Sequence, residues 1–210
     1  MPRPPRVSPD RILAAAAGEF AARGFAGARV DRIARRARVN KAMLYYHFGS
    51  KQALYEALLR RTFAAAAGRI RAIAAADLSP ADKIDQVIEG IAAFVKEHEH
   101  FPAIMMREVA EGGAHLDAAT LAELAAVPRA VGAIVEEGVK RRLFRPVDPI
   151  AAYFTMFPPI VFYLAGAPIR RRLSSQHLLN ANRLPPELFV RHLQQSLRLA
   201  LAADRPKARS

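Results

Sequence analysis

The chain has 210 residues, which is enough to bury a hydrophobic core without metals or cross-links. Its 52% apolar and 24% charged residues are typical of a globular protein and exclude disorder of the whole chain. It contains no cysteine, so disulfides, thiolate zinc sites and cysteine nucleophiles are excluded. The first thirty residues contain no pattern typical of a secretory signal, and we expect a cytoplasmic protein.

The net charge of +13 is concentrated near the N-terminus. Residues 1–61 contain 13 basic and 4 acidic side chains, whereas residues 62–210 contain 19 and 15. A basic first third before a nearly balanced remainder indicates a polyanion-binding module attached to a body with another role. Ordinary solvated arginine on helical surfaces is the alternative that charge alone leaves open.

The composition predicts an all-α fold, because alanine is abundant and apolar residues seldom alternate at period two. Residues 1–7, with three prolines, are expected to form a disordered basic arm. Ser8 is the predicted N-cap of the first helix, Pro9 its first residue, and Gly24 its end. The other helices are expected at residues 30–37, 41–47, 51–76, 81–97, 101–112, 117–141, 149–166 and 186–203, before a disordered tail at 204–210.

Two of these helices, 30–37 and 41–47, are short and are joined by three residues, which is the size of a helix-turn-helix. Asn40 is the predicted N-cap of the second. Its outer side combines cationic and hydrogen-bonding aromatic side chains, which suit phosphates and base edges: Lys41, Tyr45 and Tyr46. The pattern favours DNA binding over a chance helical hairpin with a solvated face.

The stretch Gly24 to Leu54, GFAGARVDRIARRARVNKAMLYYHFGSKQAL, resembles the N-terminal DNA-binding domain of the TetR (tetracycline-repressor) family of bacterial transcription regulators. The resemblance implies that residues 41–47 form the recognition helix in the major groove and that Lys51 contacts a phosphate. Together with the charge pattern, it gives this expected set of DNA-binding residues: Arg29, Arg38, Asn40, Lys41, Met43, Tyr45, Tyr46, His47 and Lys51.

Three positions depart from the pattern of that family. Ala28-Arg29 replaces the hydroxyl residue expected before the helix at 30–37, which removes a helix cap. Arg38 stands where the family usually has glycine, and this predicts a turn whose backbone is not strictly left-handed. Ala42 also stands where glycine is common, so turn geometry and operator choice stay open.

We expect a helix-turn-helix domain at 8–55 and a helical effector-binding and dimerisation bundle at 56–203. Residues 149–169 are uncharged and long enough to suggest a membrane span, although Pro158-Pro159 is expected to kink or break their helix. A buried homodimer interface explains the lack of charge equally well and is the interpretation that we favour. A membrane-associated helical adaptor that uses residues 149–169 is the alternative.

The predicted ligand-binding residues are aromatic, methionine or charged side chains of the body: Phe94, Phe101, Met105, Met106, Arg107, Tyr153, Phe157, Phe162 and Tyr163. A plain core role is the alternative for each of them, and a surface ion pair for Arg107 with Glu108. The predicted dimer interface is an apolar stripe with one further aromatic residue: Phe154, Leu188, Phe189, Leu193, Leu197 and Leu201.

Histidines and glutamates around residues 97–115 raise the question of a metal site. His98 and His100 would lie about 200° apart on a helix, too far round to share one ion readily. We therefore interpret these two residues, His115, Glu97, Glu99, Glu108 and Glu111 as a solvated helix end, and we expect no metal or cofactor.

The sequence as a whole predicts a ligand-responsive transcription regulator. We expect a homodimeric repressor that a small-molecule effector releases from a near-palindromic operator on double-stranded DNA, about 34 Å between half-sites. No nucleophile elbow, phosphate loop or paired-histidine metal motif is present in the chain, so we expect no enzyme.

Overall fold

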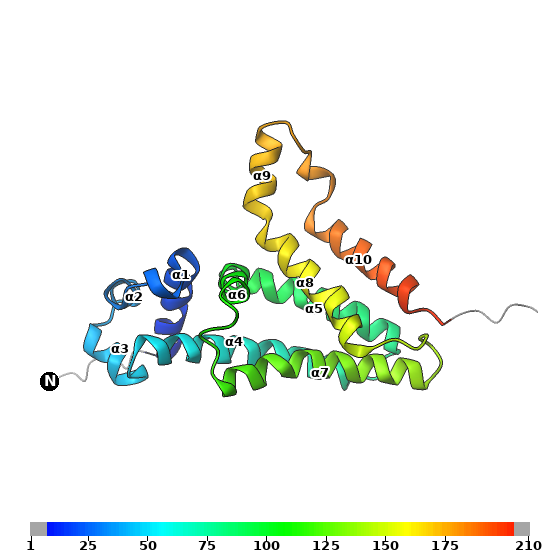
Figure 1. Cartoon of the computed structure of the whole chain (residues 1–210), viewed down its shortest axis with the longest axis horizontal. Coiled ribbons are helices and arrows are strands. Elements are labelled where there is room, and N and C mark those ends of the chain that lie inside the picture. Colours follow the sequence, from blue (N-terminus) through cyan, green and yellow to red (C-terminus); the bar gives the residue numbers. More distant parts are fainter. Residues whose placement is uncertain (1–7, 204–210) are drawn as a thin grey trace, which may run out of the picture. The chain divides into compact units, whose positions relative to one another are not determined.

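The computed structural model of the chain describes residues 8–203, and within them it contains helices and no strand (Figure 1). The prediction of an all-α fold is confirmed. The expected basic arm at 1–7 and tail at 204–210 lie outside the described residues. The helices are α1 Pro9–Gly27, α2 Val30–Ala37, α3 Lys41–Phe48, α4 Lys51–Ala74, α5 Pro80–Glu97, α6 Phe101–Ala110, α7 Ala118–Lys140, α8 Pro149–Ala165, α9 Ala167–Ser175, the 3₁₀ helix η1 Ala181–Arg183, and α10 Pro186–Leu201.

Local signals fix the first helix as expected. The Ser8 hydroxyl oxygen accepts a hydrogen bond from the backbone N–H of Asp10 at 3.2 Å, and Pro9 is the first helical residue. At Gly24 the backbone leaves the helical region (φ 68°, ψ 176°), so α1 is kinked there before a last turn that ends at Gly27.

The contacts divide the described chain into two compact units. The first unit combines the residues up to 64 with residues 98–123, and the second combines residues 65–97 with those from 124 onward. The contiguous boundary expected at residue 55 differs from this division, because α6 packs on α1 although about eighty residues separate them.

The first unit is built around α1, which contacts both α2 and α6. Its core contains large apolar side chains that are almost fully buried: Ile12, Phe20, Ile33, Leu44, Leu54 and Tyr55. Burial of this kind contributes about 1.5–3 kcal/mol for each large side chain. This core holds α2 and α3 in place.

The second unit packs α5, α8 and α10 against one another. Lys83 of α5 is buried, and its ammonium lies 2.8 Å from a carboxylate oxygen of Glu137 in α7. The ammonium and a second bond from Arg141 lower the pKa of Glu137. These contacts tie α5 to α7 through a charge pair in which the lysine is withdrawn from solvent.

One glycine of α7 is required by close packing. Phe144, just after the helix, folds back so far that a Cβ at Gly138 would overlap its ring. Phe144 also forms an isolated antiparallel bridge with Ala202, next to the end of α10. The backbone N–H of Arg145 donates to the carbonyl of Leu201 at 2.9 Å, so the α7–α8 connection is joined to the end of α10.

The predicted break at the proline pair of α8 is wrong. The helix continues through Pro158-Pro159, and the chain bends by 51° between α8 and α9, around Gly166. The carbonyls that the prolines leave without helical donors are those of Phe154 and Thr155, two exposed residues, where water can replace the missing bonds. The following α9 and η1 were not predicted, because their polar sequence looks like a loop.

The membrane interpretation has no specific support from the helices. By length and composition α7 could cross a membrane, and so could α8 with α9 if the bent pair formed one span. The inner side of α7 is buried within the chain, through Val127, Val131, Ile134 and Val135. A buried core helix passes the same length and composition test.

Candidate nucleic-acid interface

The helix-turn-helix begins at Arg29, the N-cap of α2. Within the described residues the Arg29 side chain makes no capping bond, as expected from the missing hydroxyl. The carboxylate of Glu19 in α1 compensates, because it accepts the backbone N–H of Arg29 at 3.3 Å. The same carboxylate lies 3.4 Å from Arg23 and 3.8 Å from Arg32. The start of α2 is therefore held by α1 instead of by its own cap.

The turn between α2 and α3 places Arg38 in the left-handed region, with φ 51° and ψ 46°. The prediction of a different conformation is wrong. The turn demands this backbone whichever residue occupies it, because the N–H of Arg38 bonds to the carbonyl of Arg35 and that of Val39 to Ala34, at 3.0 and 2.9 Å. The side chain of Arg38 is exposed, so its cation remains available.

The third helix, α3, starts at the expected cap and ends one residue beyond the predicted end. The side-chain oxygen of Asn40 accepts the backbone N–H of Met43 at 2.7 Å. Leu44 is fully buried, and it fixes the rotation of the helix on the core. Gly49 (φ 76°) ends α3, and its N–H bonds to the carbonyl of Tyr45 at 2.7 Å.

The rotation of α3 turns three polar side chains outward, and we call Lys41, Tyr45 and Tyr46 the recognition face. Tyr45 is 40% exposed and Tyr46 82% exposed. The ammonium of Lys41 lies 3.0 Å from a carboxylate oxygen of Asp31 in α2, and this hydrogen bond raises the pKa of Lys41. Both partners are exposed, so the pair is weak and can exchange for a phosphate.

Two of the predicted DNA-contact residues, Met43 and His47, are only partly exposed. The Nε2 atom of His47 is buried and has no hydrogen-bond partner among the described residues. Its ring packs edge-on against Tyr46 at 5.5 Å between centroids. His47 is partly exposed and contacts the ring of Tyr46.

Lys51 is occupied inside the first unit. Its ammonium donates to the carbonyls of Phe25 at 2.8 Å, Ala28 at 3.2 Å and Ala26 at 3.4 Å. It also lies 4.5 Å above the centre of the Phe25 ring. These three bonds use all the donors of the ammonium, so the expected phosphate contact does not fit this geometry. Instead, Lys51 joins the start of α4 to the end of α1.

The predicted ligand-binding residues are divided between the two units. In the first unit, Phe101 is buried and packs edge-on against Phe63, while Met105 is partly exposed. Met106 and Arg107 are exposed on α6.

In the second unit, the predicted ligand-binding residues mostly pack on the protein itself. Phe94 is buried, and Tyr153 is buried against Phe157 with 5.3 Å between ring centres. Tyr163 stacks on Phe189 at 4.1 Å, lies under Arg170, and donates its hydroxyl to the Leu184 carbonyl.

Phe162 is 67% exposed, so it does not line an enclosed cavity within its own chain. A groove of about 640 Å³ lies elsewhere in this unit, lined by Ala133, Glu136, Glu137, Val139, Lys140, Val147 and Pro149.

The predicted dimer interface is only partly exposed. Leu193, Leu197 and Leu201 are buried in their own chain, so they are not interface residues. Their spacing of four forms the side of α10 that packs on α5 and α8. Phe154 is 61% exposed, Leu188 is exposed and Phe189 is partly covered. We call the exposed side chains of α8 and α9, Ile150, Phe154, Phe162 and Ile169, the apolar face.

The region expected to be a solvated helix end contains a buried carboxyl group. Glu108 is 1% exposed, so the expected surface ion pair with Arg107 is wrong. Its Oε1 accepts the hydroxyl of Tyr55 at 2.7 Å, and burial together with this bond raises the pKa of Tyr55. Among the described residues, His115 and Glu111 join Glu108 in one cluster, without His98 or His100. The sequence raised the question of a metal site among these residues but did not indicate which of them come together, and the contact of Glu108 with Tyr55 spans 53 residues.

Family comparisons agree with these elements in both units. A model of bacterial regulatory proteins of the tetR family matches residues 12–58, and a model of the tetracyclin repressor-like C-terminal domain matches residues 80–185. The first match contains all of α2 and α3.

Several transcription regulators are similar to the chain. The HTH-type transcriptional repressor NicS of Pseudomonas putida is 30% identical over 73% of this chain and 74% of its own length. The HTH-type transcriptional regulator RutR of Escherichia coli is 29% identical over 75% and 74%. The repressor SCO4008 of Streptomyces coelicolor is 46% identical, but over only 28% of this chain and 31% of its own.

Solved structures share the fold at low identity. FadR from Bacillus subtilis, solved in complex with stearoyl-CoA, has a TM-score of 0.71 at 15% identity and covers 92% of this chain and 100% of its own. KstR2, a ketosteroid transcriptional regulator of Mycobacterium tuberculosis, has a TM-score of 0.70 at 17% identity, with 93% and 95% covered. The helical arrangement is thus that of known transcription regulators.

Proposed function

We propose a specific mode of action for this chain, which belongs to the TetR family of bacterial regulatory proteins and is a DNA-binding regulator. It acts as a homodimeric repressor that binds a near-palindromic operator and leaves it when a small-molecule effector binds. The recognition face of α3 enters the major groove, and the surrounding arginines neutralise phosphates. We assign it no catalytic role and place it in the cytoplasm, where its DNA lies.

The observation that carries this proposal is the outward orientation of Lys41, Tyr45 and Tyr46 on a short helix whose opposite side, at Leu44, is fully buried. A helix held in this way can insert its outer side into a groove about 12 Å wide. Tyrosine hydroxyls hydrogen-bond to phosphates or base edges, and a lysine adds charge. Arg29 and Arg38, both exposed, extend the positive surface at the two ends of α2.

Two copies are needed, because a single helix of this length reads too few base pairs to define one site in a genome. We assign the subunit contact to the apolar face together with Leu188 and Phe189. Apolar rings that protrude from a helix need a cover, and a second copy supplies an identical one through a two-fold axis.

The effector is assigned to the helices of the second unit, where Phe94, Tyr153 and Phe157 remain the candidate contacts. Relatives of the same fold include a regulator solved with stearoyl-CoA and a ketosteroid regulator. An apolar effector therefore fits the expected lining. Its binding would shift the population toward a dimer whose two recognition helices no longer match the half-sites.

The experiment starts with footprinting of the purified protein on genomic DNA, which identifies the operator. Fluorescence anisotropy at several salt concentrations then compares Tyr46→Ala and Lys41→Ala with the wild type. Each variant is expected to weaken binding about tenfold to a hundredfold, since one good contact is worth about 1–3 kcal/mol. Lys41→Ala should also reduce the salt slope by about 1.

The matched control is Lys140→Ala, which removes an equally exposed lysine from the end of α7. It should leave operator affinity unchanged. Circular dichroism confirms that each variant is folded. Wild-type affinity in both recognition-face variants would reject the assignment of α3 to the groove.

A further inference from the structure

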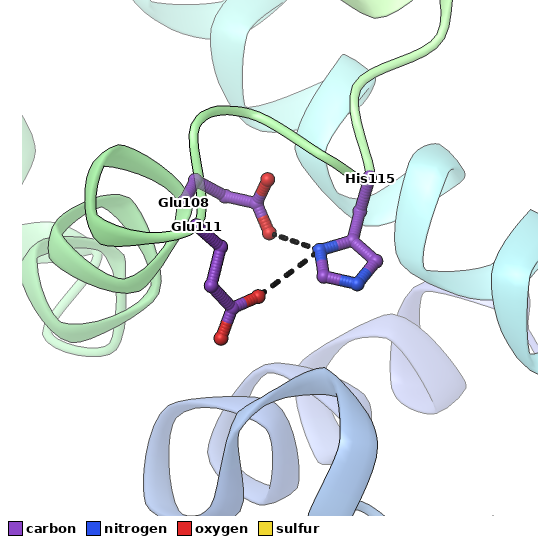
Figure 2. Close-up of side chains that lie close together, drawn as sticks. All are labelled: Glu108, Glu111 and His115. Carbon is purple, nitrogen blue, oxygen red and sulfur yellow. Dashed lines mark hydrogen bonds and ion pairs between the residues drawn. The ribbon is translucent and has the colours of Figure 1, made fainter.

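A cluster of two glutamates and one histidine lies at the end of α6 in the first unit. After Ala110 the chain reverses through Gly112 and Gly113, both with positive φ (68° and 74°). The N–H of Gly113 bonds to the carbonyl of Glu108 at 2.7 Å, which closes the turn. The reversal returns the chain over the last turn of α6, and it places His115 beside the two glutamates (Figure 2).

One ring nitrogen of His115 faces both carboxylates. Its Nδ1 lies 2.9 Å from Oε1 of Glu108 and 3.3 Å from Oε2 of Glu111 (Figure 2). The other ring nitrogen points away from them. The three donor atoms all lie within 4.8 Å of one another. A nitrogen and two carboxylate oxygens therefore converge on one small volume.

The burial of Glu108 makes this cluster electrostatically unusual. Its side chain is almost fully enclosed, and Oε2 has no hydrogen-bond partner within residues 8–203. A carboxylate in such a place is unfavourable unless a positive charge compensates it. Tyr55, the partner of Oε1, is a neutral donor and adds no charge. Two carboxylates thus face a single imidazole.

We propose that Glu108, Glu111 and His115 bind one divalent transition-metal ion, of which zinc fits the donor set best. One imidazole nitrogen and carboxylate oxygens are ordinary zinc ligands. Adjacent ligands on a tetrahedral ion with bonds near 2.1 Å lie about 3.4 Å apart, close to the 3.3 Å between Nδ1 and Glu111 and longer than the 2.9 Å between Nδ1 and Glu108. The remaining oxygen–oxygen edge can shorten, because Glu111 is exposed and can move.

The fourth coordination position falls to water, since Glu111 borders solvent. An ion at this place would replace whatever proton Nδ1 shares with the carboxylates and would supply the missing positive charge beside Glu108. It would also hold the imidazole ring, which packs on Phe25 with 4.3 Å between ring centres. Metal binding is therefore expected to stabilise the first unit, and it does so whether or not the operator assignment is correct.

The test uses the full-length chain without a histidine tag, stripped of metal with a chelator. Zinc chloride is titrated by isothermal calorimetry, and Co²⁺ absorption serves as a spectroscopic probe of coordination. We expect one zinc ion per chain with a dissociation constant in the micromolar range or below, and a higher melting temperature with zinc. Failure of wild-type protein to bind would overturn the proposal and leave His115 as a hydrogen-bonding partner of both glutamates.

Three variants locate the site. His115→Gln keeps a polar side chain of similar reach, and Glu111→Gln changes an exposed residue, so both are expected to fold. Each should weaken zinc binding at least tenfold and abolish the thermal shift. His100→Ala, at the start of α6 and outside the cluster, is the matched control and should bind like the wild type. Unchanged stoichiometric binding in both cluster variants would place the ion elsewhere and reject the site.

Discussion

Two surfaces of this chain expose aromatic rings, and they differ in what those rings carry. On the recognition face, Tyr45 and Tyr46 end in hydroxyl groups and stand beside the ammonium of Lys41. On the apolar face, Phe154 and Phe162 have no polar atom, and Ile150 and Ile169 are aliphatic. The first surface suits a hydrated polyanion, whereas the second suits a partner that excludes water.

The difference teaches that exposure alone does not identify a binding surface. The hydroxyl group of a tyrosine hydrogen-bonds to water until a phosphate or a base replaces that water. The recognition face is therefore stable in the free protein. An exposed phenylalanine stabilises a contact only when that contact covers it, by about 25 cal/mol per Å² of apolar surface buried. Charged side chains are therefore compatible with the recognition face but should disrupt a contact at the apolar face.

The largest effect is expected on the apolar face. The double change Phe154→Glu with Phe162→Glu would force two carboxylates into a dry contact, at a cost of at least about 3 kcal/mol. This corresponds to a rise of more than about a hundredfold in the dimer dissociation constant. Sedimentation velocity measures the dimer dissociation constant. The control is Ala119→Glu, which adds one carboxylate at an exposed position near the start of α7. A dimer as stable as the wild type would show that another surface joins the subunits.

An intermediate effect is expected from Lys51→Met, which keeps the apolar stem and removes the ammonium. Three backbone carbonyls at the end of α1 then lose their donor, and stability should fall by about 2 kcal/mol. Urea unfolding followed by circular dichroism measures this loss. Because the ammonium faces the protein, the salt slope of DNA binding should stay the same. A slope reduced by about 1 with unchanged stability would instead make Lys51 part of the recognition surface.

The smallest effect is expected at the turn between α2 and α3. Arg38→Gly should be about 1 kcal/mol more stable than Arg38→Ala, because glycine adopts the left-handed backbone without the steric cost of a Cβ. Both variants lack the cation, so both should show the same weakened DNA binding. Thermal unfolding and anisotropy separate the two properties. Equal stability of the pair would mean that the turn relaxes when Arg38 is replaced.

The ends of the helices in the helix-turn-helix domain could be predicted because the residues that determine them interact locally. Ser8 and Asn40 act as caps through bonds to residues two and three positions away, and Leu44 follows from helical spacing. The same spacing indicated that Tyr45 and Tyr46 face outward, and the family resemblance added the assignment of residues 41–47 to the recognition helix. Ends of helices and outward side chains are thus readable wherever the interactions stay within one or two turns.

Other features could not be read because they depend on distant partners. The stripe of Leu193 and Leu197 shows that one side of α10 is apolar, but not that it packs on its own chain. Similarly, Lys51 looks like a free cation until the end of α1 folds beside it. Glu108 looks solvated next to Arg107 until Tyr55 covers it. In each case an element far along the chain decides the environment.

The ring of Phe144 that covers Gly138 has a consequence for anyone who redesigns this protein. Alanine normally improves a helix by removing the conformational freedom of glycine, so a stabilisation protocol based on helix propensity would include position 138. Here the added methyl group would expel the ring and release the join between the α7–α8 connection and the end of α10. A saturation library should therefore tolerate almost no replacement at this position, despite its place in an ordinary helix.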